Sequence, residues 1–109
     1  MSDFVIVLTT LPAAFDAASL AKDLVERGLA ACVNVLPPMQ SVYRWDGKVH
    51  QDAEQQLLMK TTLARIDALG DAVRAAHPYD VPEFVVVPIV QGSPQYLQWI
   101  AASVAEPRA

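Results

Sequence analysis

The sequence predicts an α+β fold formed by a single domain over residues 1–109. Three observations predict it: apolar runs of strand length rich in β-branched residues, apolar positions that recur at helical spacing between those runs, and an Asp-Gly pair between two strand-like segments. A chain of 109 residues can bury one core. It contains no low-complexity tract and no repeat with motif identity, so we expect one domain.

The first predicted strand is Phe4–Leu8, because FVIVL is short, apolar and typical of a strand buried on both faces. We expect Thr9–Pro12 to end it. A helix follows, with Gly28 where a C-terminal cap belongs. Its apolar stripe recurs at helical spacing: Ala14, Ala17, Ala18, Ala21, Leu24 and Val25.

The central part of the chain predicts a long hairpin. A strand is expected at Ala30–Leu36, and Pro37-Pro38 predicts a bend or bulge at an exposed edge. Strand character resumes at Ser41–Trp45, and Asp46-Gly47 is a strong hairpin signal. The returning limb begins polar, in the sequence KVHQDAEQQ, and becomes apolar at Leu57–Met59.

The second helix is expected to begin at a cap supplied by Thr61 or Thr62 and to stop at Pro78. The positions of its buried stripe are Leu63, Ile66, Leu69, Val73 and Ala76.

The last strand is predicted at Glu83–Val90, where Pro88 requires an edge or a bulge. Ser93 as cap and Pro94 in the first turn then predict a final helix whose stripe is Leu97, Ile100 and Val104. The order is β-α-β-β-α-β with an extra C-terminal helix, which is the ferredoxin-like, split β-α-β arrangement.

Composition and charge narrow the range of partners. The net charge is −4 and the eight basic residues are scattered, so nucleic acid and anionic membrane are not expected partners. The chain is 53% apolar and only 18% charged, which favours subunits that bury surface against each other. The first residues carry no basic region and no apolar run reaches about 18 residues, so we expect neither a signal peptide nor a membrane span. The single Cys32 excludes an internal disulfide and suits a reducing cytoplasm.

The motifs give little support to catalysis. The four glycines stand alone, so no phosphate-cradling loop is expected, and no nucleophile elbow is present. Cys32 could pair with His77 in a hydrolase, but a thiol in the middle of a strand between apolar residues is usually buried and inert. We therefore predict that the protein is not an enzyme.

The stretch AHPYDVPE at residues 76–83 allows two interpretations. His77, Asp80 and Glu83 carry metal-ligand atoms, but their spacing is not a recognised metal pattern. Alternatively, Pro78 and Pro82 make the stretch a rigid turn between the helix and the strand. The spacing favours the turn, with a metal site as its second role.

The predicted hairpin carries apolar side chains that would be costly to leave in water, Val42, Tyr43 and Trp45. We expect hairpins of neighbouring subunits to pair and to bury them.

Five motifs in order and spacing, LAACVNVLP, SVYRWDGK, MKTT, AHPYDVPE and YLQWI, cover nearly the whole chain. Through them the sequence resembles the divalent-cation tolerance protein CutA family. The resemblance implies a ferredoxin-like fold, a tight homotrimer similar to PII-like signalling trimers and a cytoplasmic location. It also implies binding of copper or another divalent cation, with no established catalytic activity.

The resemblance transfers only part of a metal site. Some members are credited with ligation by a cysteine at the end of the first strand and by a His-His pair before Pro-Tyr. The corresponding residues here are Thr9 and Ala76-His77, so only His77 matches. Without a thiolate, a tight copper site is not expected.

The family's polar residues near the subunit boundary are retained as Trp45, Glu54, Lys60 and Glu83. Lys60 could form an interface ion pair with Glu54 or Glu83, or the group could bind a ligand. With Tyr79, these residues would line an intersubunit cleft.

The sequence therefore predicts a trimeric cytoplasmic protein of the divalent-cation tolerance type, with weak metal binding at His77 and a PII-like signalling role. The alternative is a structural trimer scaffold for a partner protein, with no ligand of its own. A cleft lined by Lys60, Tyr79 and Glu83 would favour the first interpretation.

Overall fold

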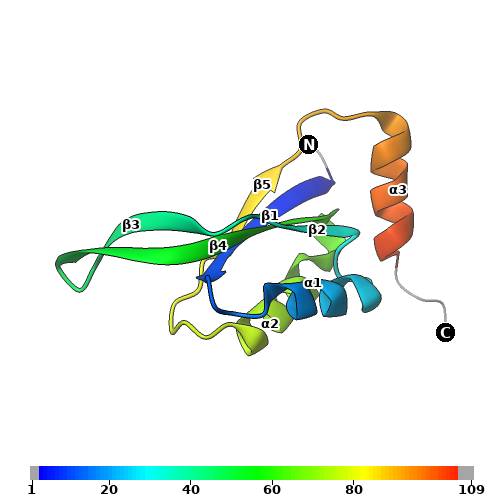
Figure 1. Ribbon diagram of the computed structural model, residues 1–109. Helices are drawn as coiled ribbons and strands as arrows, with labels where there is room; N and C mark the ends of the chain where they lie inside the picture. The colour runs from blue at the N-terminus through cyan, green and yellow to red at the C-terminus, as the bar shows by residue number, and fades with distance from the viewer. Residues whose placement is uncertain (1–2, 106–109) are drawn as a thin grey trace.

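The computed structural model describes residues 3–105 as one antiparallel sheet with three helices (Figure 1). The strands are β1 (Phe4–Pro12), β2 (Cys32–Val35), β3 (Met39–Trp45), β4 (Lys48–Thr62) and β5 (Val85–Pro88). The helices are α1 (Ala17–Glu26), α2 (Ile66–Ala76), preceded by a 3-10 turn at Leu63–Arg65, and α3 (Pro94–Val104). Among these residues, no helix is both long enough and apolar enough to span a membrane.

Strand β4 connects the whole sheet. The strand order is β2-β4-β1-β5, and β3 pairs with the first half of β4. Each of these pairings is antiparallel, so β1 and β2 run parallel with β4 between them. The predicted α+β class is confirmed, but the order contains one strand more than the predicted β-α-β-β-α-β with its C-terminal helix. The interruption at Pro37-Pro38 separates β2 from β3, as the sequence predicts.

One face of the sheet forms the core with α1 and α2, which lie together beneath it (Figure 1). Alternate residues of β1 point to this face, and their β4 partners are buried with them. The fully buried side chains of this layer include Val5, Val7, Leu11, Leu57 and Met59 from the strands and Leu24, Leu69 and Val73 from the helices.

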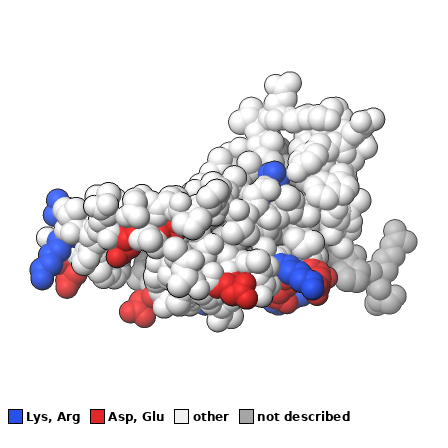
Figure 2. All heavy atoms as spheres, viewed as in Figure 1, with Lys and Arg blue, Asp and Glu red and all other residues white. Residues whose placement is uncertain are grey.

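The opposite face of the sheet is covered only at one end, where α3 packs Ile100 and Val104 against Ala31. We call the remainder the open face; its apolar members are Ile6, Leu8, Leu58, Val85 and Val87. The two valines are 47% and 41% exposed. Figure 2 shows that charged side chains gather along the helices and at the hairpin tip, whereas the side above the sheet is largely uncharged.

Strand β1 corrects one prediction: it does not end at Leu8 but continues to Pro12. Its last four residues pair with Glu54–Leu57 of β4, and this ladder overrides the weak local signal of Thr-Thr-Leu-Pro. Strand β5 is shorter than predicted, and Pro88 lies at its end opposite Val5, where its missing N–H is tolerated.

The predicted caps of α2 are wrong. Thr61 and Thr62 are the last residues of β4, and the Thr61 hydroxyl donates to the Leu29 carbonyl at 2.8 Å. Ser93 does precede α3, but its side chain makes no capping hydrogen bond.

Helix α1 begins at Ala17, and the sequence did not predict its cap. The cap is Asp16, whose side chain accepts a hydrogen bond from the Ser19 backbone N–H at 3.2 Å. Three predicted members of its stripe are exposed, because Ala14 lies before the helix and Ala18 and Val25 lie off its buried face. In α2, Ala76 is also exposed, and so is Leu63 in the turn before it. Cys32 is half-buried on the open face rather than fully buried.

Two threonines of the core face provide a matched test of hydrogen-bond satisfaction. The Thr9 hydroxyl is fully buried with no partner among the described residues, whereas that of Thr61 is bonded. We expect Thr9→Val to raise the free energy of unfolding by about 1 kcal/mol and Thr61→Val to lower it by about 1–2 kcal/mol. Urea denaturation at one protein concentration measures both; a destabilised Thr9→Val protein would contradict the assignment.

Candidate functional site

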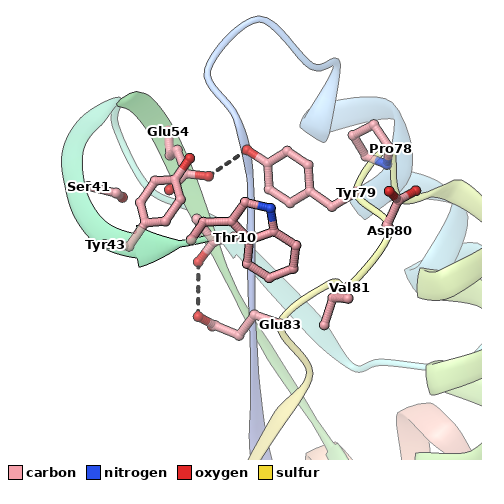
Figure 3. A pocket seen from close by; sticks show the side chains of 10 residues that line it. Thr10, Ser41, Tyr43, Glu54, Pro78, Tyr79, Asp80, Val81 and Glu83 are labelled. Carbon is pink, nitrogen blue, oxygen red and sulfur yellow. Dashed lines mark hydrogen bonds between the residues drawn. The ribbon is translucent and has the colours of Figure 1, made fainter. Parts of the chain in front are cut away.

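A cavity of about 550 Å³ opens between the hairpin and the loop that connects α2 to β5 (Figure 3). We call it the hairpin pocket. Its lining comes from the end of β1, from β3 and β4, and from the loop: Thr10, Ser41, Tyr43, Trp45, Glu54, Pro78, Tyr79, Asp80, Val81 and Glu83. Figure 3 shows Tyr43 and Glu54 on one side of this space and Tyr79, Asp80 and Val81 on the other.

The hairpin wall is built by alternation along β3 and β4. The turn uses Asp46 and Gly47 at φ 53° and 74°, the left-handed conformation that this dipeptide favours. Tyr43 donates its hydroxyl to the Asp52 carboxylate and stacks on His50, with ring centroids 5.5 Å apart. The hydrogen bond to Asp52 favours the neutral phenol and therefore raises the pKa of Tyr43.

The loop wall begins where α2 ends. Residue 77 is extended, at φ −75° and ψ 134°, and the helix stops before Pro78 as predicted. His77 Nε2 lies 2.9 Å from the Thr10 carbonyl oxygen, and the Tyr79 backbone N–H donates to Nδ1 at 3.2 Å. These partners assign the proton to Nε2 and engage both ring nitrogens.

Burial lowers the pKa of His77, against the opposing influence of the Thr10 carbonyl and the charges of Glu54 and Glu83. The ring is 9% exposed and does not line the hairpin pocket. Its contacts bind the loop to β1 and hold Tyr79 at the pocket wall. The rigid-turn interpretation of AHPYDVPE thus has a geometric basis.

Two carboxylates are held in the pocket by hydrogen bonds (Figure 3). Glu54 is only 6% exposed, and its Oε2 accepts from the Tyr79 hydroxyl at 2.5 Å. Burial, together with Glu54, raises the pKa of Tyr79. Glu83 accepts from Thr10 Oγ1 at 3.2 Å and from Gln56 Nε2 at 3.3 Å, which joins the loop to β1 and β4.

Four of the five residues predicted for the cleft line the hairpin pocket: Trp45, Glu54, Tyr79 and Glu83. Lys60 does not. It lies on the open face with its Nζ 5.8 Å from the centroid of the Tyr96 ring of α3, so neither predicted ion pair is present among the described contacts. Tyr43 and Asp80 also line the pocket, but neither was predicted for the cleft. Tyr43 could have been, because it shares one face of a predicted strand with Trp45.

Metal-ligating side chains do not converge in the described residues 3–105, where no group of three His, Cys, Asp or Glu could hold an ion. Thr9 faces the helical core, and Ala76 is exposed at the end of α2. The pocket can therefore offer a cation separate carboxylates and ring faces rather than a ready-made chelating group.

Comparison with known proteins identifies the family. The family model described as CutA1 divalent ion tolerance protein matches residues 5–103, and the chain belongs to this family. It is 48% identical over 95 residues to the divalent-cation tolerance protein CutA of Thermus thermophilus, covering 87% of this chain and 92% of that protein.

Two plant proteins are also similar. Protein CutA, chloroplastic, of Arabidopsis thaliana is 42% identical over 99 residues, which are 91% of this chain and about half (54%) of that protein. The crystal structure of CutA1 from Oryza sativa superposes with a TM-score of 0.90 at 42% identity, and covers 97% of each chain.

The pKa of His77 predicts a pH dependence of stability. Burial lowers the pKa of His77 in the folded protein below the ordinary value of 6.5. As the pH falls through 6.5, the unfolded chain therefore binds a proton at His77 more readily than the folded protein does. The melting temperature should therefore decrease from about pH 7 to about pH 5, and less steeply in His77→Gln, which keeps a donor for Thr10. Thermal unfolding monitored by circular dichroism tests this; equal slopes for both proteins would refute it.

Proposed function

We propose that this member of the CutA1 divalent ion tolerance family is a cytoplasmic homotrimer that binds cations in the hairpin pocket. The observation that carries the proposal is the chemistry of the lining, which contains three carboxylates and three aromatic rings but no Lys or Arg among the described residues. A pocket of this charge attracts cations and repels anions.

The open face supports the trimer. Its apolar side chains include Val85 and Val87, which one chain leaves partly exposed on a largely uncharged surface (Figure 2), and an exposed apolar patch of this kind is typical of a protein–protein interface. The hairpin adds Val42, Trp45 and Val49, which are 66%, 53% and 63% exposed. Three copies that cover each other's open faces and pair their hairpins would bury both sets of side chains.

The descriptions of the family and of its relatives support a role in divalent-cation tolerance, and the hairpin pocket is the site that we propose for the cation. A metal ion held there by one or two carboxylates and water binds weakly, since a tight site needs more converging ligands. Imidazole at His77, the ligand predicted from the sequence, would first have to leave Thr10 or Tyr79. Copper is the preferred divalent ion in either case.

The role is binding or PII-like signalling rather than catalysis. His77 is engaged by backbone groups, and the Cys32 Sγ lies 3.8 Å from Asn34 Oδ1, so neither residue is part of a nucleophile-base pair among the described contacts. The alternative remains a structural trimer scaffold for a partner protein. It rests on the open face alone and requires no ligand in the pocket.

Assembly gives the first test. We expect light scattering at micromolar concentration to give the mass of three chains. Trp45→Ala should then lower the free energy of unfolding by about 3–5 kcal/mol, because the trimer would cover the surface of the ring that does not border the pocket and that one chain leaves exposed. Val25→Ala, on the outer side of α1, is the control and should change it by less than about 0.5 kcal/mol. A monomeric mass would refute the trimer.

Calorimetric titration of metal-free protein with copper and zinc tests the site. We expect micromolar or weaker binding, with copper preferred, and at least about tenfold lower affinity for Glu83→Gln. Asp71→Asn, which removes an exposed carboxylate of α2 that does not line the pocket, is the control. Binding that is lost in His77→Ala but retained in Glu83→Gln would instead place the metal at His77. Absence of binding in the wild-type protein would favour the scaffold.

A further inference from the structure

Aromatic side chains form much of the hairpin pocket. Tyr43 and Trp45 come from β3, and Tyr79 comes from the loop after α2. Both phenols donate to carboxylates, Tyr43 to Asp52 and Tyr79 to Glu54, so their rings are fixed and electron-rich. The three rings are 38–53% exposed, and the pocket is the space that they border. Electron-rich ring faces attract cations.

The carboxylates of the pocket are left without counter-charges. Glu54, Asp80 and Glu83 line it, whereas Lys22–Glu26, Arg27–Asp23 and Arg74–Asp71 are ion pairs along α1 and α2, between side chains three or four residues apart. Glu54 is the most deeply buried of the three, and the Tyr79 hydroxyl engages only its Oε2 among these contacts. A buried carboxylate with a free oxygen gains most from a cationic ligand.

The size of the pocket selects the kind of cation. About 550 Å³ lies within the range of small-molecule sites and far exceeds one metal ion. The carboxylates are also too dispersed for three ligands to meet at one point in the described structure. Rings and separated carboxylates around such a space suit a cation that is itself several atoms wide, with an apolar surface that the rings can cover.

We propose that the hairpin pocket binds a small organic cation, of the alkylammonium or quaternary ammonium class. The ammonium group lies against the faces of Tyr43, Trp45 and Tyr79, and Glu54, Asp80 and Glu83 balance its charge. The inference rests on the assignment of the pocket as a ligand site under the proposed function, but it names a ligand that requires no metal.

The test compares choline with 3,3-dimethyl-1-butanol, a neutral molecule of the same shape, by calorimetry on the assembled protein at low salt. We expect choline to bind in the micromolar to millimolar range and the neutral isostere to bind at least about tenfold more weakly. Equal binding of the two would show an apolar pocket without cation selectivity and would overturn the proposal. Absence of choline binding would also overturn it.

Variants locate the site. Trp45→Leu keeps apolar volume but removes the ring, and should weaken choline by between about 2-fold and 30-fold. Trp99→Leu removes a similarly exposed indole from α3, outside the pocket lining, and should bind as the wild type does. If Trp45→Leu does not assemble, Glu83→Gln serves instead and should weaken choline but not the isostere. Unchanged choline affinity in the folded pocket variant would exclude this pocket.

The metal titration separates this inference from the proposed function. Choline binding in the presence of a chelator, with no response to copper or zinc, would refute the divalent-cation role and uphold the organic-cation site. Copper binding that depends on Glu83, without choline binding, would do the reverse.

Discussion

The register of β4 is the constraint on which the rest of the structure depends. This 15-residue strand pairs with β1, β2 and β3, so one alignment decides the direction of side chains in both the sheet and the hairpin. It turns Leu57 and Met59 into the helical core and Gln56 towards Glu83 at the pocket. A slip by one residue would exchange these faces along the whole strand. Fold and site therefore cannot vary independently.

The same alternation explains why the opposite face remains apolar. Helices α1 and α2 occupy only one side of the sheet, and α3 covers only the end of the other, near Ala31 (Figure 1). Side chains that face away from the core, such as Val85 and Val87, thus remain partly uncovered by the residues that the structure describes. The hairpin pocket lies at the end of that face, where β4 leaves the sheet to pair with β3 alone. The pocket and the open face therefore lie on the same side of the sheet.

The sequence predicts those features that short-range chemistry determines. Asp46-Gly47, the Pro37-Pro38 break and the end of α2 before Pro78 all follow from backbone preferences of a few residues. The length of β1 and the partner of Lys60 were not predictable in this way. The first depends on a ladder to a strand more than 40 residues distant, and the second on where the C-terminal helix brings Tyr96. The residue pattern within one segment does not reveal the β1–β4 ladder or the contact between Lys60 and Tyr96.

The pocket residues are linked by contacts that run from β1 to β4 through the loop. The Thr10 carbonyl holds His77, His77 holds the Tyr79 backbone, and the Tyr79 hydroxyl holds Glu54. Glu54 stands opposite Pro12 in the ladder, so the contacts close on the strand where they began. Each member satisfies a polar group that burial would otherwise make costly. Because the links are consecutive, a change at His77 alters the pocket wall through Tyr79 even though its ring never reaches the cavity. The histidine thus positions the pocket wall without lining the cavity.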